Sequence, residues 1–255
     1  MSRLRARCPA CRMFTAVAVG PGYECHACGR AFAAGLVRVP RAWGRGGEAM
    51  AEAARLELAY PEAAVVERAT LEEQSEALAA DLPERPLVLG GCCCAHVGAV
   101  RGLAARGGRL ALVWLDAHGD LNTPETSPSG NLWGMPLRML LDEGTVAVAD
   151  TALVGARNLD PGEVEFVERT GLDDSLERTL EGADRVYVAL DLDVLDPGQA
   201  AVFVPEPGGP SVAEVEELLR GVAERAPVAG VGVTGLVPDE RNLPVVARLL
   251  AALGL

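Results

Sequence analysis

Short apolar runs alternate with amphipathic segments along most of the chain, and each kind of segment predicts a different element. Helices are predicted over residues 48–58, 71–82, 95–106, 161–170, 175–182, 211–226 and 242–255. Strands are predicted over 86–91, 109–120, 151–157, 184–194 and 228–237. Apolar strands that alternate with helices are typical of a parallel sheet covered by helices on both faces. The pattern therefore predicts an α/β fold.

Length and composition fit one large α/β domain with a small appendage. The chain has 255 residues, of which 49% are hydrophobic. No apolar run approaches the roughly 18 residues that a membrane-spanning helix needs. The first residues, MSRLRARCPAC, contain no apolar segment of the kind found in signal peptides. We therefore expect a soluble cytoplasmic protein without a membrane partner.

The basic residues limit the chemistry that is available. All of them are arginine, and the absence of lysine excludes a Schiff-base nucleophile, a pyridoxal-phosphate lysine and a Walker-A lysine. The net charge is −13, although the first 47 residues are rich in arginine and contain one acid, Glu24. The acidic remainder disfavours nucleic acid as a partner of the main domain, whereas the arginine-rich N-terminal segment is compatible with it.

Two C-x₂-C pairs near the N-terminus predict a metal site. Thirteen residues, with a Gly-Pro-Gly turn among them, separate the pairs, and His26 is expected to be a bystander. Two disulfides or a redox pair are the alternatives. Disulfides are disfavoured without a secretion signal, and no βαβ pattern surrounds either pair. We predict a zinc ribbon over residues 1–36 that holds one structural Zn²⁺. Its ligands would be Cys8, Cys11, Cys25 and Cys28.

A second group of candidate ligands follows two of the predicted strands. Asp116, His118 and Asp120 are spaced i, i+2, i+4, and Asp191 and Asp193 repeat that spacing after another strand. In an extended chain such side chains point the same way, at the strand ends where α/β sheets place ligands. Two acidic loops that cap nearby helices are the simpler interpretation. Four aspartates in one crevice would repel one another strongly unless cations were bound, so the pattern favours two divalent metal ions.

These motifs resemble those of the ureohydrolase family, which includes arginase, agmatinase and formiminoglutamase. The resemblance covers residues 37–255 and rests on DAHGDLNTPETSPSGNLWGMPL, VGARNLDPGE and LDLDVLDP…PEPGG, in that order. It implies a three-layer α/β/α sandwich with a parallel, mostly eight-stranded sheet and a binuclear manganese site. It also implies a small-molecule substrate and allows a homo-oligomer.

Carried over by position, the family's metal ligands fall on the candidate residues. Asp116 and Asp191 would bridge both metals, Asp120 would complete the shell of one, and His118 and Asp193 that of the other. Asp120 and Asp191 are the expected catalytic residues, and Asp196 would be structural or would support the metal ligands. Four further positions match residues that hold the amino-acid end of the substrate in arginases, and Glu163 is also retained. The four are Asn122, Ser129, Asn131 and Asp160.

Three positions depart from the family pattern. Cys93, in the run GGCCC, stands where the family has a metal-binding histidine. A thiolate ligand there would favour Zn²⁺ or Fe²⁺ over Mn²⁺. The alternatives are that His96 reaches back to the metal, or that the thiols are buried small hydrophobes. Trp133 replaces a histidine, and Gly235 replaces a glutamate that pairs with guanidinium.

The function implied is hydrolysis of a C–N bond in a small amidine or guanidino compound, with metal-bound hydroxide as the nucleophile. The alternative is a non-catalytic or regulatory relative whose zinc ribbon binds a partner.

Overall fold

A computed structural model describes residues 5–6, 8, 11, 13, 15–19, 22–32 and 35–255. Its main body is built on a parallel sheet in the strand order β6-β5-β7-β11-β10-β8-β9. The strands are β5 (Gly35–Val39), β6 (Glu62–Val65), β7 (Pro86–Gly90), β8 (Leu110–Leu115), β9 (Thr151–Val154), β10 (Arg185–Asp191) and β11 (Val228–Thr234). The predicted α/β class is confirmed. The described residues form seven parallel strands, where the family resemblance implied about eight.

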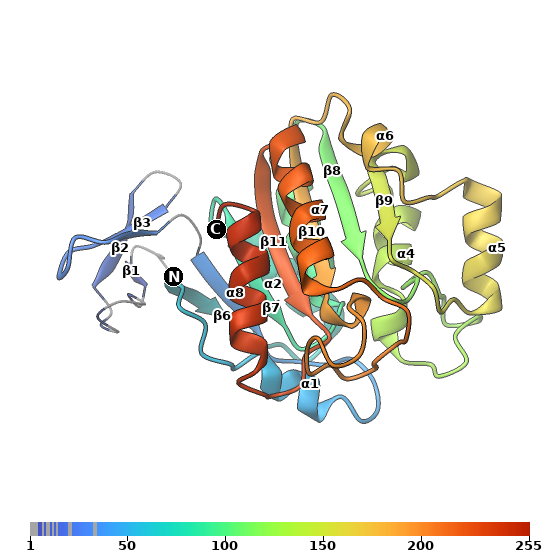
Figure 1. The fold of residues 1–255 in the computed structure, drawn as a ribbon, viewed down its shortest axis with the longest axis horizontal. Coiled ribbons are helices and arrows are strands. Elements are labelled where there is room, and N and C mark those ends of the chain that lie inside the picture. Colours follow the sequence, from blue (N-terminus) through green and yellow to red (C-terminus); the bar gives the residue numbers. More distant parts are fainter. Residues whose placement is uncertain are drawn as a thin grey trace.

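Helices cover both faces of this sheet, as Figure 1 shows with α7 and α8 in front of the strands. The helices are α1 (Glu48–Ala53), α2 (Leu71–Ala80), α3 (Ala95–Ala104), α4 (Pro136–Asp142), α5 (Pro161–Thr170), α6 (Leu176–Leu180), α7 (Val212–Arg225) and α8 (Asn242–Ala252). Three short 3₁₀ helices are η1 (Leu132–Gly134), η2 (Val148–Asp150) and η3 (Leu192–Val194). The result is the predicted three-layer α/β/α arrangement.

Alternate residues of each central strand enter two separate cores. In β8, Val113 and Leu115 pack with the residues that α7 and α8 bury, whereas Leu112 and Trp114 pack with those of α2 and α3. Successive side chains of a strand point to opposite faces, so a strand buried on both sides must be apolar throughout. This explains why the central strands appear in the sequence as continuous apolar runs.

The edge strand β6 and its neighbour β5 were not predicted, and in β5 a charge interrupts the apolar pattern. Arg38 is the fourth of the five residues of this strand and is 8% exposed. Its Nε donates to Glu62 Oε2 of β6 at 2.7 Å, and a terminal nitrogen donates to two backbone carbonyls near the end of α1. The pair joins the two strands, and these hydrogen bonds offset the cost of burying the guanidinium.

A small antiparallel sheet precedes the main body. Its strands are β1 (Arg5–Ala6), β2 (Ala16–Val19), β3 (Gly22–Cys25) and β4 (Ala31–Phe32), paired in that order. Cys8, Ala16, Tyr23 and Cys25 form its small core, against which Ala63 of β6 packs. The division into a ribbon over 1–36 and a body over 37–255 stays a prediction, and β5 of the main sheet begins at Gly35.

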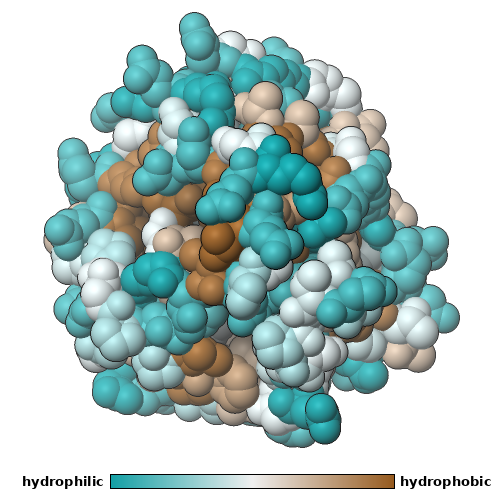
Figure 2. Space-filling view, turned by 90° about the vertical axis from the view of Figure 1, so that its right-hand side faces the viewer, coloured by the Kyte–Doolittle hydropathy of each residue, from teal (hydrophilic) through white to brown (hydrophobic). Residues whose placement is uncertain are grey.

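Hydrophilic side chains cover most of the face on the α5 side, and hydrophobic residues are visible in the hollows between them (Figure 2). Among the helices in the described part of the chain, none is both long enough and apolar enough to cross a membrane.

Candidate metal centre

The candidate ligands gather at the carboxyl ends of four adjacent strands. Cys93 lies in the turn after β7, Asp116 directly follows β8, Asp191 is the last residue of β10, and Thr234 is the last residue of β11. These strands are neighbours in the order β7-β11-β10-β8. Carboxyl ends of parallel strands are where open α/β sheets bind ligands. The topology therefore brings residues far apart in the sequence into one site.

Two groups of side chains in this site have the spacing of metal ligands. Cys93, Asp116 and Asp120 form one group, and Asp116, His118 and Asp193 form the other. Within each group one ligand atom per residue lies within 4.8 Å of the others. Asp116 belongs to both groups. A carboxylate shared by two adjacent clusters has the arrangement that bridges two ions.

The ligands do not lie along extended strands, as the sequence spacing predicted. Asp193 lies in η3, so the chain turns from strand to 3₁₀ helix between Asp191 and Asp193. The amide of Asp193 donates to Asp191 Oδ1 at 3.0 Å and fixes that turn. After β8, the backbone leaves the strand, and Asp120 has a φ of 54°, which few residues other than glycine adopt. The carboxylates converge through these turns.

Asp191 and the Cys93 thiol are in direct contact. Cys93 Sγ donates to Asp191 Oδ2 at 2.9 Å and lies 3.7 Å from Asp116 Oδ2. The Thr234 hydroxyl donates to the same Asp191 oxygen at 3.0 Å. The three thiols of the run are buried. Cys93 therefore lies within the carboxylate cluster and is placed to act as a ligand.

His96 faces the core beneath the site. Its Nδ1 lies 3.0 Å from the Tyr187 hydroxyl, its Nε2 lies 3.2 Å from Thr234 Oγ1, and its ring packs edge-on against Trp114. Burial lowers the pKa of His96 to about 3, so the ring is neutral. Both nitrogens are engaged by hydroxyls. His96 thus supports Thr234, which in turn holds Asp191.

The electrostatics of the cluster favour bound cations. Burial raises the pKa of Asp191 to about 7, with a further contribution from Asp193. Burial and the Asp116 charge raise the pKa of Asp193 to about 6. Burial also raises the pKa of Asp120 well above its usual value, and its Oδ2 has no hydrogen-bond partner. Crowded carboxylates with an unpartnered oxygen fit divalent cations, which would compensate the charge and occupy the free oxygen.

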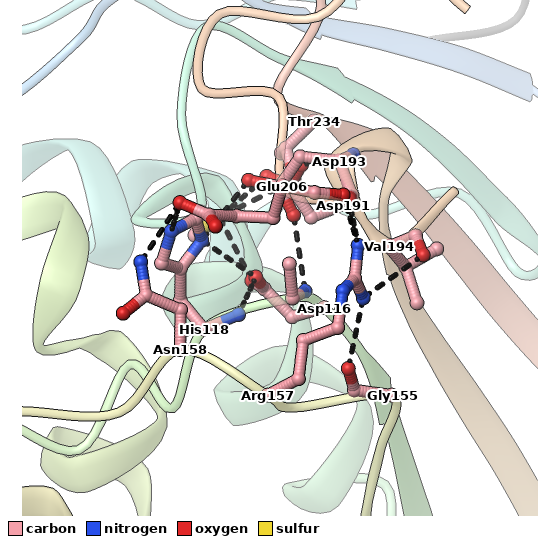
Figure 3. Close-up of polar contacts among 12 residues, drawn as sticks. Asp116, His118, Gly155, Arg157, Asn158, Asp191, Asp193, Val194, Glu206 and Thr234 are labelled. Atoms are coloured by element: carbon pink, nitrogen blue, oxygen red, sulfur yellow. Dashed lines mark hydrogen bonds and ion pairs between the residues drawn. The ribbon is translucent and has the colours of Figure 1, made fainter. Parts of the chain in front are cut away.

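His118 bonds to carboxylates on two sides (Figure 3). Its Nδ1 lies 3.1 Å from Asp193 Oδ2 and 3.4 Å from Asp116 Oδ1, and its Nε2 lies 3.6 Å from Glu206 Oε1. Burial opposes the charged form, but the bonds to Asp116 and Asp193 raise the pKa of His118 to about 12. Glu206 also accepts a hydrogen bond from Asn158 Nδ2 at 2.8 Å. With Nδ1 turned toward the aspartates, the ring is oriented for metal binding.

Four residues of the site were missing from the sequence prediction: Arg157, Asn158, Glu206 and Thr234. Arg157 donates to the carbonyls of Gly155, Val194 and Glu206 and so ties three loops together (Figure 3). Arg157, Asn158 and Glu206 lay inside quoted motifs, VGARNLDPGE and PEPGG, which was the available signal. No sequence signal pointed to Thr234, because threonine is common in strands and carries no motif of its own.

The cluster opens into a cavity of about 180 Å³. Asn122, Ser129 and Asp160 line it, and their role as substrate contacts stays a prediction. Asn122 Nδ2 donates to Asp160 Oδ2 at 2.8 Å, which joins two of these side chains. The side-chain carbonyl of Asn131 instead accepts a hydrogen bond from the backbone amide of Arg45 at 3.0 Å. Its role as a substrate contact stays a prediction.

Comparison with known proteins identifies the family. A family model described as "Arginase family" matches residues 47–253. The chain belongs to the arginase family. It is similar to the arginase of Bacillus caldovelox, with 36% identity over 189 residues that cover 62% of this chain and 63% of that protein. It is also similar to the arginase of Bacillus subtilis strain 168, with 38% identity over 158 residues, 51% of this chain and 53% of that protein. The matched part thus spans less than two thirds of these curated relatives.

Solved arginase structures share the fold over a longer stretch. The native structure of the Bacillus caldovelox arginase superposes with a TM-score of 0.72 and 29% identity, covering 86% of this chain and 97% of that chain. Formimidoylglutamase from Bacillus subtilis, at 20% identity and a TM-score of 0.70, shows the same fold. The family resemblance and the arginase-like fold expected from the motifs are confirmed.

Within the arginase family fold, Gly235 and Trp133 are accommodated by their surroundings. Gly235 has a φ of 74°, and a Cβ there would overlap Asp191 Oδ1. Any side chain at this position would displace the carboxylate. The ring of Trp133 packs against Gly44 and Gly47, where added methyl groups would collide with it. The two residues that depart from the family pattern, Gly235 and Trp133, are therefore both packed closely against their neighbours at the site.

The four N-terminal cysteines also cluster. Cys8 Sγ lies 3.7 Å from Cys28 Sγ, and Cys11 Sγ lies 3.6 Å from Cys25 Sγ. All four sulfurs lie within 4.8 Å of one another. This is the spacing of a four-thiolate site.

Proposed function

We propose that this chain is a binuclear metal-dependent hydrolase of a C–N bond in a small amidine or guanidino compound. The observation that carries the proposal is the position of Asp116 in two adjoining ligand clusters at the carboxyl edge of the sheet. Membership of the arginase family supports the same reaction class. Divalent ions at such a site activate water as the nucleophile and polarise the carbon that is attacked.

Each candidate residue has a role in this proposal. Asp116 and Asp191 would bridge the two ions; Cys93 and Asp120 would hold one, and His118 and Asp193 the other. Glu206 lies 3.6 Å from His118 Nε2 and its charge would help to orient the ring, while the Thr234 hydroxyl fixes one oxygen of Asp191. Asn122, Ser129 and Asp160 would bind the end of the substrate away from the reacting carbon.

The two proposed sites differ in chemistry, and this bears on the metals. Manganese is the family's metal and suits the oxygen and nitrogen donors of Asp116, His118 and Asp193. The thiolate of Cys93 would make the other site softer and favour Zn²⁺ or Fe²⁺ there.

We also propose that Cys8, Cys11, Cys25 and Cys28 hold one structural Zn²⁺. A hydrogen bond with Thr15 Oγ1 at 3.1 Å lowers the pKa of Cys25 to about 6, which favours its thiolate. A small antiparallel sheet with few core residues needs such a metal for stability. Assembly into a homo-oligomer stays a prediction.

Turnover and metal content test the proposal together. The protein, loaded with Mn²⁺ or Zn²⁺, is assayed for release of ammonia and urea over a panel of amidino and guanidino compounds. Asp120→Asn removes one ligand charge, and asparagine tolerates the positive φ of this position. Asp142→Asn, on an exposed ion pair with Arg138, is the matched control.

The proposal predicts turnover of at least one compound, its loss in Asp120→Asn and its retention in Asp142→Asn. Two bound ions without turnover of any compound would favour the alternative, a non-catalytic relative whose ribbon binds a partner. The absence of any metal beyond that of the ribbon would overturn the proposed centre itself.

A further inference from the structure

Part of the lining of the candidate active-site cavity is apolar. Met50 of α1, Cys92, Trp133 of η1, Phe203 and Val204 line it, and Gly235 contributes backbone. We call these six residues the apolar wall. Met50 and Cys92 belong to a small hydrophobic cluster, separate from the two cores of the sheet, against which Trp133 and Phe203 pack.

The apolar wall is held in place by specific contacts. The rings of Trp133 and Phe203 meet edge to face, with centroids 5.9 Å apart and an interplanar angle of 79°. The amide of Phe203 donates to the carbonyl of Gly235 at 2.8 Å. Gly44 and Gly47 leave room for the Trp133 ring. An aromatic pair that is packed and hydrogen-bonded in this way forms a fixed surface.

The apolar wall adjoins the metal centre directly. Cys92 precedes the candidate ligand Cys93, and Gly235 approaches Asp191 so closely that it has no room for a Cβ. A substrate carbon that reaches the two clusters would therefore lie beside Gly235, whose carbonyl accepts from Phe203, and its substituent would enter the part of the cavity that Phe203 and Val204 line.

The carboxylates of the cavity either belong to the proposed metal-ligand set or are engaged by the protein. Three of them, Asp116, Asp120 and Asp193, belong to the metal-ligand clusters, and a fourth, Asp191, contacts the cluster residue Cys93. Asp160 accepts from Asn122 and caps α5. Glu163 accepts from the backbone amides of Leu121 at 2.9 Å and Asp160 at 2.8 Å. A nitrogen placed against the apolar wall would thus lose its hydrogen bonds to water without gaining a carboxylate, which disfavours it.

We infer that the substrate is an amidine whose reacting carbon bears an apolar group of aromatic size, in place of the third nitrogen of a guanidine. This inference rests on the proposed function. In the reaction, the oxygen of water adds to the amidine carbon and one C–N bond breaks. The nitrogen leaves as ammonia with both protons of the water, and the other product is a carboxamide.

Two hydroxamic acids test this preference on the metal-loaded protein. Hydroxamates bind metal ions through their two oxygens, and acetohydroxamate and benzohydroxamate differ only in the group on the carbonyl carbon. Binding of each is measured by calorimetry. We expect benzohydroxamate to bind about tenfold more tightly, as burial of a ring against apolar side chains predicts.

Variants of the apolar wall should reduce this ratio. Phe203→Ala should bring it close to one, and Val204→Thr, which is nearly isosteric and leaves no cavity, should lower it about threefold. Val65→Ala, on the exposed surface of β6, is the matched apolar truncation and should leave the ratio unchanged. Equal binding of the two hydroxamates to the unaltered protein, or an unchanged ratio in Phe203→Ala and Val204→Thr, would overturn the inference and leave the metal centre intact. Binding of neither hydroxamate would overturn the proposed metal centre.

Discussion

Replacing Gly235 by alanine should damage both stability and metal binding. Gly235 has a φ of 74°, so alanine there costs about 1 kcal/mol in backbone strain alone. The added Cβ also overlaps Asp191 Oδ1, and this carboxylate is 4% exposed. To move away, Asp191 must weaken its hydrogen bonds from the Asp193 amide and the Thr234 hydroxyl, both 3.0 Å long.

The weakened hydrogen bonds of Asp191 cost more than the backbone strain. Hydrogen bonds to a charged group contribute about 1.5–3 kcal/mol each, so weakening two of them adds roughly 2–4 kcal/mol to the strain. Gly144→Ala is the matched control, because Gly144 has a φ of 70° and an added Cβ would meet no atom within 4 Å. Gly144→Ala should therefore lose only the stability that corresponds to the backbone strain.

Urea unfolding of the metal-free proteins measures the loss of stability, and metal titration by calorimetry measures the loss of metal affinity. Gly235→Ala should unfold with a free energy roughly 2–4 kcal/mol lower than that of Gly144→Ala, and should bind metal at least tenfold more weakly. If both variants lose the same stability and bind metal alike, the close approach of Gly235 to Asp191 does not matter to the site, and the reasoning is wrong.

Three further predictions concern the ribbon, the titration of the site and its metal preference. Changing Cys8 and Cys11 together to serine should release one zinc and unfold the ribbon, which elemental analysis and NMR would detect; retained zinc would contradict it. The metal-free protein should lose stability as pH rises from about 4 to 7. The native pKa of Asp191 is raised to about 7 from 3.8, so its stabilising contribution is complete below 3.8 and disappears above 7. Urea unfolding of the metal-free protein should show a lower free energy of unfolding at pH 8 than at pH 5, and a higher one at pH 8 would contradict the prediction. Cys93→His should shift metal preference toward Mn²⁺, whereas Cys94→Ser should not; competition between Mn²⁺ and Zn²⁺ decides.

The sequence predicted the layers of the fold because both faces of the central strands are buried. Continuous apolar runs such as that of β8 follow from this burial, and the helices between them follow from the parallel connections. It did not predict β5, whose pattern Arg38 breaks, nor its partner β6. The ion pair with Glu62 that makes this burial tolerable is a contact between separate strands, which periodicity along one segment does not reveal.

The ligand types were readable from the sequence, but the way they converge was not. The spacing of Asp191 and Asp193 suggested one extended strand, whereas the chain turns into η3 between them. Glu206 and Thr234 reach the site through a loop and a neighbouring strand, so their roles depend on tertiary contacts. Cys93 could be placed in register by resemblance, and its contact with Asp191 then came from the folded structure.

The metal content of Asp191→Asn tests the central claim most directly. The unaltered protein, loaded with divalent metal and analysed for elements, should contain two ions per chain beyond the zinc of the ribbon. Because Asp191 is proposed to bridge both ions, Asp191→Asn should lower the occupancy of both, while Asp142→Asn should retain two. Full two-metal occupancy in Asp191→Asn, or a single body ion in the unaltered protein, would contradict a binuclear centre built on this carboxylate.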